Sequence, residues 1–450
     1  MNPAATCGMA LNSPMPRTFL RPKILWLRFG PDLQHYSCGR IRTIQKNCAA
    51  CRNICWREAA GSQSLPTESG ATDLIIVLLA VLVGALVYSA LSIVAADRYL
   101  SIRAPALVSP APVSILKPLA GLDLDLESNL RTFFEQDYPT FEILFAVSLS
   151  TDPAIAVVEK LQREYARVPT RLLITGAPPY PNAKVFSLDR MLGVASNDLV
   201  VMSDSDTRVT PDLLSTVAAE FQDARVGVAT CPYRAVAGTS IWSRLEATGM
   251  NTDFIAGILV ARMLEGMRFA VGPTIVARRS AIESIGGFER LKDFLAEDFA
   301  LGKFAAEAGH GVILSSYVIE HHIGSADLRQ SASHRLRWSR STRRSRPLGY
   351  IGQLFTMPVP LALLIVALHS AWWPLIALTV AVRALAAYVV SARVLRAKVN
   401  WLLLPIEDIT AFGFWIAGFF GNTIKWRGRR YRLQRDGRFE LIKSSSNLNT

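Results

Sequence analysis

Two carboxylates lie where they could bind a metal ion. Asp204-Ser-Asp206 comes directly after the apolar run Leu199–Met202, which has the length and composition of a buried strand. Two acids two residues apart suit a divalent cation with oxygen ligands, and such a cation can neutralise a diphosphate leaving group. About one Asp-x-Asp pair is expected by chance in a chain of this length. Asp123-Leu-Asp125 also matches, but it precedes a helical pattern, where Asp is a capping residue, and we interpret it as structural.

A second acidic pair, Glu297-Asp298, lies further along the chain. It follows Gly286-Gly-Phe288 and precedes the helical run Phe299–Ala308. An acid at this position is a candidate general base that removes a proton from an acceptor hydroxyl. The alternative is structural, because acids at the start of a helix interact favourably with the helix dipole.

Arg337-Trp338 lies in an Arg-rich stretch before the second apolar region of the chain. The arginine could bind a pyrophosphate, and the tryptophan could form an aromatic wall. The alternative is a basic face that lies on anionic lipid. His321-His322 could bind a metal ion, but an isolated adjacent pair usually does not.

The middle of the chain alternates short apolar runs with helical patterns. This alternation predicts a parallel α/β sheet, in which ligands bind beyond the carboxyl ends of the strands. The expected strands are Val113–Leu116, Phe141–Ser148, Thr170–Ile174 and Leu199–Met202, and the expected helices are Leu126–Phe134, Ala154–Tyr165 and Ser187–Ala195.

The composition indicates a membrane protein. Of the 450 residues, 50% are hydrophobic and only 19% are charged, and the mean hydropathy is +0.26. These values exclude a disordered or fibrous protein and argue against a purely soluble one. The run Leu74–Ala96 has no charge and predicts a transmembrane helix at 73–97. A second region, Leu354–Val390, is long enough for two crossings with a turn between His369 and Pro374.

A third apolar run, Trp401–Trp426, contains Glu407 and Asp408. Carboxylates inside a membrane are costly and indicate a function by default. The alternative is that they lie at an interface beside Arg383 or Arg396. Because basic residues flank the run on both sides, we expect a re-entrant or interfacial element rather than a single crossing.

The net charge of +13 comes largely from clusters next to the apolar runs and from the first part of the chain. The positive-inside rule places the clusters on the cytosolic side. We therefore expect a cytosolic domain at 104–346, a C-terminal membrane region at 353–426 and a basic cytosolic tail at 427–450. The charge indicates attraction to an anionic membrane surface rather than to nucleic acid.

Residues 1–72 show no clear periodicity and an excess of basic residues. Cys48, Cys51 and Cys55 resemble a fragment of a metal site, but no second Cys-x-x-Cys or paired His follows at zinc-finger spacing. We expect a poorly ordered basic extension that the working enzyme does not need.

Together these motifs resemble the ceramide glucosyltransferase family, a branch of inverting, membrane-bound glycosyltransferases. The resemblance covers about Leu74 to Leu433, and it implies a GT-A (Rossmann-like) domain with one N-terminal and two or three C-terminal transmembrane or interfacial helices. The motifs that carry it are Val113-Ser-Ile-Leu-Lys-Pro-Leu119, Phe134-Glu-Gln-Asp-Tyr-Pro139, Asp152-Pro-Ala-Ile155, Asp204-Ser-Asp206, Gly286-Gly-Phe288, Glu297-Asp-Phe299, Arg337-Trp338 and Trp426-Arg-Gly-Arg-Arg-Tyr-Arg-Leu433.

The resemblance also implies roles for single residues. Asp298 matches the catalytic base, and Asp204 and Asp206 match the ligands of a divalent metal ion, Mn²⁺ or Mg²⁺. The nucleotide-sugar would be bound by Lys117, Asp152, Asn182, Lys184, Asp204, Arg337 and Trp338. The donor would be a UDP-sugar, with UDP-glucose first, and the acceptor a hydroxyl of a ceramide-type membrane lipid. The enzyme would be an integral protein of a bacterial inner membrane, with its catalytic domain in the cytosol.

Two departures from the family pattern leave the acceptor open. His334 occupies the place of Gln or Arg at the start of the motif that ends in Arg337-Trp338, and Asn251-Thr-Asp-Phe254 lacks a His that the animal enzymes carry nearby. The same motifs, with Pro347-Leu-Gly-Tyr350, also resemble the bacterial hopanoid-associated glycosyltransferases, which implies transfer of N-acetylglucosamine to a hopanoid polyol. A processive polysaccharide synthase and a non-enzymatic binder of lipid surfaces are weaker alternatives.

Overall fold

The computed structural model describes residues 68–324, 326–426 and 428–442. Residues 1–67 of the expected basic extension, with its three clustered cysteines, lie outside the described residues. Residues 68–72 of the expected extension belong instead to a helix that begins at Glu68.

The α/β part of the chain, residues 113–314, which we call the catalytic block after the activity that the sequence resemblance implies, is built around a seven-stranded sheet with the order β3-β2-β1-β4-β8-β6-β9. The first four strands of this order run parallel, and β8 is antiparallel to both of its neighbours. The strands are β1 (Val113–Pro118), β2 (Phe141–Val147), β3 (Thr170–Ile174), β4 (Leu199–Ser203), β6 (Val226–Thr230), β8 (Thr274–Arg278) and β9 (Gly311–Leu314).

Helices cover the sheet and bury its two faces. Along β1 the side chains of Val113 and Ile115 enter one hydrophobic core and that of Leu116 enters the other, as the alternation of a strand requires. This arrangement confirms the predicted α/β fold class. The helices of the block are α2 (Leu126–Phe134), α3 (Ala154–Glu164), α4 (Ala183–Val194), α5 (Leu213–Glu220), α8 (Arg279–Ser284), α9 (Glu297–Glu307) and the short 3₁₀ turn η2 (Phe288–Leu291).

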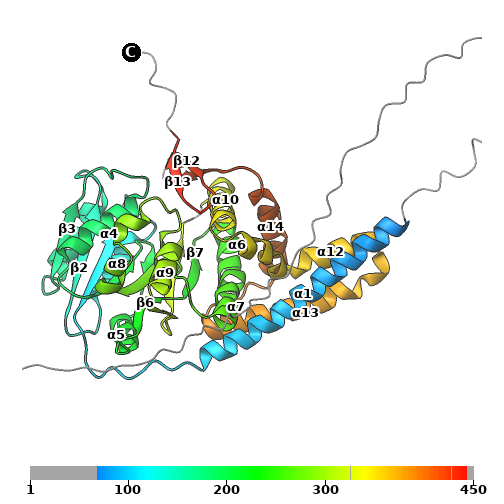
Figure 1. Ribbon diagram of the computed structural model, residues 1–450, viewed down its shortest axis with the longest axis horizontal. Coiled ribbons are helices and arrows are strands. Elements are labelled where there is room, and N and C mark those ends of the chain that lie inside the picture. The colour runs from blue at the N-terminus through cyan, green and yellow to red at the C-terminus, as the bar shows by residue number, and fades with distance from the viewer. Residues whose placement is uncertain (1–67, 325, 427, 443–450) are drawn as a thin grey trace, which may run out of the picture. The chain divides into compact units, whose positions relative to one another are not determined.

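Two small sheets complete the set of strands. One has the order β5-β10-β7, formed by β5 (Thr207–Arg208), β7 (Tyr233–Ala237) and β10 (Ile319–Ile323). The other is the C-terminal sheet of β11 (Thr423–Trp426), β12 (Arg429–Leu433) and β13 (Phe439–Leu441). It lies near α10 (Leu328–Ser345), the helix that carries Arg337 and Trp338 (Figure 1).

Helices that are apolar on most sides form the membrane region. Within the described residues, Thr72–Leu100 and Ser370–Val394 are long and apolar enough to cross a membrane. A pair bent by 65°, Pro347–Thr356 and Pro358–Leu368, passes the same test only when its two parts are taken together. Figure 1 shows α12 and α13 running along α1. The elements are α1 (Glu68–Leu100), α11 (Pro347–Gly352), η3 (Gln353–Thr356), α12 (Pro358–Leu368), η4 (Ser370–Trp372), α13 (Pro374–Ala387) and the π-helix η5 (Tyr388–Val394).

The third apolar run forms a shorter helix than the spans. This helix, α14 (Leu403–Gly418), has 16 residues, and the chain then enters strand β11. It packs against α10 and against α6 (Ile241–Gly249), which continues through the π-helix η1 (Met250–Phe254) into α7 (Ile255–Glu265). The expected turn between the two parts of the second apolar region is present at His369–Trp373, but the part before it is broken into α11, η3 and α12.

Candidate active site

The carboxyl ends of β1 and β4 lie side by side where the strand order reverses, which is where open α/β sheets bind ligands. Asp204, Ser205 and Asp206 form the turn between β4 and β5. Lys117, at the end of β1, is fully buried beneath this turn. Its ammonium group donates to the Asp204 carbonyl and to Thr207 Oγ1 (3.1 Å) and lies 3.7 Å from the centre of the Phe133 ring. Lys117 therefore supports the turn from below.

Lys184 connects the two acidic pairs that the sequence separates. Its Nζ lies 2.6 Å from Asp204 Oδ1 and 2.9 Å from Glu297 Oε1. Asn182 is buried at the start of α4, where its side-chain oxygen Oδ1 accepts from the Val185 backbone amide. Its amide group donates to the Phe294 carbonyl and to Glu297. Asn182 therefore positions Lys184 and Glu297 from inside the protein. It also explains why α4 begins at Ala183, four residues before the predicted start at Ser187.

Asp298 is oriented by backbone donors. Its Oδ2 accepts from the Gly272 amide (2.6 Å) and its Oδ1 from the Phe299 amide (2.7 Å). Burial, assisted by the charge of Glu297, raises the pKa of Asp298 to about 6. Helix α9 approaches residues 269–270 closely, since a Cβ on Gly302 would lie 2.0 Å from the Ala270 amide nitrogen. The Asp298 carboxylate is thus held in place and titrates in the range of a general base.

His321, which we considered as a metal ligand and discounted because an isolated adjacent pair of histidines usually does not bind a metal ion, lies in the site. Strand β10 pairs with β5, and its register places His321 opposite Thr207, directly after the Asp204–Asp206 turn. His321 Nδ1 lies 3.6 Å from Asp206 Oδ1, and both atoms are buried without a hydrogen-bond partner. The sequence gives no local sign of this contact, because it depends on a pairing between segments more than a hundred residues apart.

The buried Oδ1 of Asp206, which has no hydrogen-bond donor, indicates that the site suits a metal ion. A buried carboxylate oxygen without a donor is costly, and a hard divalent cation supplies what it lacks. Asp204, Asp206 and His321 are the residues that could hold one, once Lys184 has released Asp204 Oδ1. As they stand, the described residues contain no preformed group of three or more His, Cys, Asp or Glu that could hold a metal ion.

Asp123 and Asp152, which precede the Asp204–Asp206 turn in the sequence, have partners within the protein. Asp152 accepts from the amide of Gly121 with both oxygens (3.1 Å each) and from that of Ala154 (2.9 Å), so it joins the turn after β1 to the start of α3. The expected capping role of the Asp123–Asp125 segment is wrong in detail. Asp125 is at the N-cap of α2 but its side chain makes no capping bond, whereas Asp123 accepts from Ser205 Oγ and so braces the Asp204–Asp206 turn.

A row of aromatic rings joins Trp338 to the carboxylates. The Trp338 ring lies 6.0 Å from that of Phe254, which lies 5.4 Å from Tyr233. The Tyr233 ring lies 5.4 Å from the His321 ring and also against Gly272, where a Cβ would come within 2.8 Å of it. Trp338 therefore belongs to the wall of the same site. Arg337 lies elsewhere on α10, with its guanidinium 6.0 Å from the Trp426 ring.

His334, at the first position of the motif that ends in Arg337-Trp338, is fixed by a buried acid. His334 pairs through Nδ1 with Glu246 of α6, which also accepts from Ser331 Oγ (3.2 Å). The His334 ring lies 4.6 Å from Trp338. This histidine thus fixes the tryptophan relative to α6.

The two carboxylates of α14 pair with arginines. Glu407 pairs with Arg335 of α10, and Asp408 pairs with Arg383 of α13 (Nε to Oδ1, 3.1 Å). Arg383 also pairs with Asp253 of η1. Of the two partners that we considered for these acids, Arg383 is the correct one, and Arg335 is an additional one that we did not expect. Buried pairs of this kind tie the catalytic block to the membrane helices.

Comparisons with known proteins identify the family of the chain. The sequence profile of glycosyl transferase family 21 matches residues 77–439. Ceramide glucosyltransferase 1 of Caenorhabditis elegans is 29% identical over 216 residues, which are 47% of this chain and 46% of that protein. The ceramide glucosyltransferase of Komagataella phaffii is 37% identical over 107 residues, 23% of this chain and 21% of that protein. The matched stretch thus covers less than half the length of either relative.

Among solved structures, a mannosyltransferase from Pyrobaculum calidifontis in complex with GDP-Man and Mn²⁺ superposes with a TM-score of 0.48 and 19% identity, covering 78% of this chain and 99% of that one.

Proposed function

Since the chain belongs to glycosyl transferase family 21, we propose that it transfers a sugar from a UDP-sugar, UDP-glucose in the first place, to the hydroxyl of a ceramide-type membrane lipid, with inversion at the anomeric carbon. One observation supports this most directly. Lys184 joins Asp204 of the predicted diphosphate site to Glu297, the neighbour of the predicted base Asp298. Donor activation and proton removal would thus take place in one connected group of residues.

Asp298 is the proposed general base. The acceptor oxygen forms a bond to the anomeric carbon as the bond from that carbon to the UDP oxygen breaks. The acceptor proton passes to the Asp298 carboxylate, and the electron pair leaves with UDP. The Gly272 amide holds one carboxylate oxygen and the raised pKa of Asp298 increases its basicity, so that proton removal is effective near neutral pH.

Asp204, Asp206 and His321 would hold a divalent cation, Mn²⁺ or Mg²⁺, which when bound neutralises charge on the two phosphates of the donor. Lys184 and Arg337 would add positive charge for the leaving group. Asp152 would lie near the nucleotide and Trp338 would form a wall of the sugar site. Lys117 and Asn182, which are buried, would act on the donor through the Asp204 turn and through Glu297.

The membrane helices would bring this site to its acceptor. Arg335–Arg346 precedes the membrane region. Its arginines are only partly exposed, so each would contribute less than the about 1 kcal/mol of attraction that an exposed cation near an anionic leaflet provides. We place the catalytic block on the cytosolic face of a bacterial inner membrane, where nucleotide-sugars are made, and we expect no nucleic-acid partner.

A hopanoid polyol is the second candidate acceptor. The specific observation that favours it is His334, which replaces the Gln or Arg of the family motif and lies 4.6 Å from Trp338. A changed side chain beside this wall would alter which hydroxyl-bearing headgroup fits.

The test is a reconstitution of the full chain in lipid vesicles with defined donors and acceptors. UDP-glucose and UDP-N-acetylglucosamine are each combined with a short-chain ceramide and with a hopanoid tetrol, and the products are identified by mass spectrometry. We expect a glucosylated ceramide. A glycosylated hopanoid would establish the second candidate, and the absence of any glycolipid, in vitro and in cells that carry the gene, would refute both.

A further inference from the structure

The C-terminal sheet pairs with the segment that precedes the proposed base. The Leu295 amide donates to the Gly437 carbonyl (3.3 Å), and the Phe439 amide donates to the Asp293 carbonyl (2.8 Å). Between these two bonds, Phe294 and Arg438 form an antiparallel bridge. The turn before β13 therefore adds an edge strand to residues 293–295, and the chain reaches Glu297-Asp298 two residues later.

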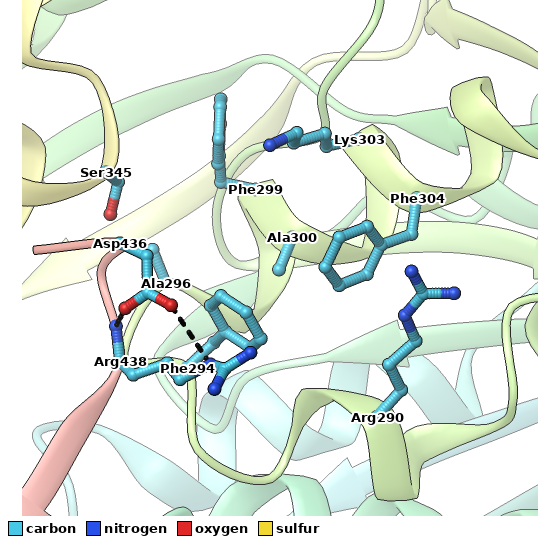
Figure 2. Close-up of a pocket in the computed structure, with 10 residues that line it drawn as sticks. All are labelled: Arg290, Phe294, Ala296, Phe299, Ala300, Lys303, Phe304, Ser345, Asp436 and Arg438. Atoms are coloured by element: carbon cyan, nitrogen blue, oxygen red, sulfur yellow. Dashed lines mark hydrogen bonds and ion pairs between the residues drawn. The ribbon is translucent and has the colours of Figure 1, made fainter.

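Side chains strengthen this junction. Leu295 enters a small hydrophobic core with Ile424, Tyr431, Leu433 and Phe439 of the sheet. The Arg438 guanidinium lies 5.5 Å from the centre of the Phe294 ring and pairs with Asp436 (3.1 Å). Phe294, Asp436 and Arg438 line a cavity of about 300 Å³. Figure 2 shows them together with Ala296 and Phe299, which line the cavity from the start of α9.

The same sheet also holds α10. Arg340 donates to the Thr423 carbonyl (2.7 Å) and Arg343 to those of Phe419 (2.6 Å) and Gly421 (2.7 Å), at the entry to β11. Trp426 of β11 faces the Arg337 guanidinium. A Cβ on Gly437 would lie 2.4 Å from Ser345 Oγ, at the end of α10.

We propose that the C-terminal sheet is a positioning element for catalysis, which fixes the segment 293–298 relative to α10 and so aligns the Asp298 carboxylate with Arg337 and Trp338. The C-terminal motif Trp426–Leu433 has no role in the proposed reaction. It would instead place two motifs that lie far apart in the sequence, Glu297-Asp298 and Arg337-Trp338. This inference rests on the proposed function for its effect on turnover but not for its effect on structure.

The test uses two glycines in the same left-handed backbone conformation. Gly437 (φ +86°) lies in the turn that contacts residues 293–295 and Ser345. Gly428 (φ +77°) lies in the other turn of the sheet, where no atom comes within 4 Å of an added Cβ. Gly437→Ala and Gly428→Ala introduce the same backbone strain, but only the first one also places a Cβ 2.4 Å from Ser345 Oγ and 3.3 Å from Ser345 Cβ, so that the turn or the Ser345 side chain must shift. Adding Ser345→Gly to Gly437→Ala removes that collision.

Two readouts on the full chain in vesicles decide the matter. Hydrogen–deuterium exchange of peptides that contain residues 293–299 and Gly272 reports the segment and the Asp298 contact directly. The kcat for transfer and the Kd for the UDP-sugar, measured separately, report the reaction. We expect Gly437→Ala to speed exchange in both peptides and to lower kcat about tenfold with Kd within about twofold, since misplaced catalytic groups reduce turnover. Gly428→Ala should change neither exchange nor kcat. The double variant with Gly437→Ala and Ser345→Gly should have the exchange rates and the kcat of the unaltered chain.

A milder pair covers the case in which Gly437→Ala does not fold. Arg438→Ala removes the cation over Phe294, whereas Arg435→Ala removes an exposed cation of the same turn. We expect a smaller loss of kcat, about threefold, for the first only. Exchange at 293–299 that stays as in the unaltered chain, or that rises equally in the Gly428 or Arg435 controls, would overturn the proposal. If the unaltered chain transfers no sugar, the proposed function fails and exchange alone decides the role of the sheet.

Discussion

At the scale of single residues, Asp298 determines how the activity should depend on pH. Its folded-state pKa is raised to about 6, mainly by burial, and a general base must be ionised to accept a proton. We therefore expect kcat to fall as the pH drops through about 6. Asp298→Asn, which cannot accept the proton, should lower kcat by a factor of about 10²–10⁴, while UDP binding changes little. Steady-state rates from pH 5 to 8 and UDP titrations measure both effects.

The control for Asp298 is an acid at the other end of the same helix. Glu307→Gln removes a carboxylate of α9 that pairs only loosely with Lys303 (3.9 Å). It should leave rate and pH profile unchanged. Turnover close to that of the unaltered chain in Asp298→Asn would rule out the general-base role.

Asp204 should control the metal dependence of donor binding. Its carboxylate follows the end of β4, next to Lys184, and Asp206 lies in the same loop two residues later. Asp204→Ala should abolish the gain in UDP-sugar affinity that Mn²⁺ or Mg²⁺ gives, as calorimetry with and without the metal ion would show. Asp198→Ala, at the opposite end of the same strand, is the matched control. If the metal-dependent gain survived in Asp204→Ala, the metal assignment would be incorrect.

The predicted positions of single residues relative to strands and helices were correct where the signal was local. Asp204 and Asp206 do follow a strand, and Asp298 does open a helix. The sequence could not reveal that His321 lies beside Asp206 or that Lys117 is buried below Asp204, because both contacts depend on which strands are neighbours. The direct contacts of Asn182 are with the protein itself. The sequence could not show this, because a helix cap and a ligand-binding amide have the same sequence signature.

At the scale of elements, strands and helices with strong periodicity were predicted almost to the residue. Thr170–Ile174 and Leu126–Phe134 agree with β3 and α2 at both ends. The antiparallel strand β8 inside the parallel sheet and the small β5-β10-β7 sheet were not predicted, since their strands are short and pair with distant segments. The broken helix at 347–368 contains prolines at residues 347, 358 and 360, which favour helix starts and interrupt a continuous span.

The charged junction between α13, α14 and η1 gives a prediction about stability. Arg383 is shared by Asp408 and Asp253, and all three are largely buried. Arg383→Met would leave two carboxylates without their cation, and breaking such a pair costs about 3–5 kcal/mol. We expect a larger fall in the thermal unfolding midpoint, measured in detergent, than for Asp408→Asn, which leaves Arg383 its second partner.

An exposed arginine of the same membrane region provides the control. Arg393→Met removes a cation from η5 without opening the buried junction. Its unfolding midpoint should stay within a degree or two of that of the unaltered chain, because exposed charges contribute about 0–1 kcal/mol. Equal losses in Arg383→Met and Arg393→Met would show that the junction contributes nothing to stability.

At the scale of the whole molecule, the apolar residues and the carboxylates of the candidate site lie in different parts of the chain. The apolar residues lie in α1, in the helices between 347 and 394 and in α14, whereas the carboxylates of the site lie at strand ends of the α/β block. This separation is what the proposed reaction, between a water-soluble donor and a bilayer-bound acceptor, would require. It also explains why a basic chain of this composition need not bind nucleic acid.

The topology can be tested with two introduced cysteines. Ser109 is exposed just before the catalytic block, and Ser370 is exposed in the turn between α12 and α13. If the bent pair at 347–368 crosses the membrane and 370–394 returns, as the basic clusters favour, these positions face opposite sides. In a chain whose six native cysteines are replaced, a membrane-impermeant maleimide added to intact cells should label Ser370→Cys at once and Ser109→Cys only after the membrane is opened. Labelling of both positions under the same condition would mean that the bent pair is re-entrant, with α12 and the start of 370–394 on the same side as the catalytic block.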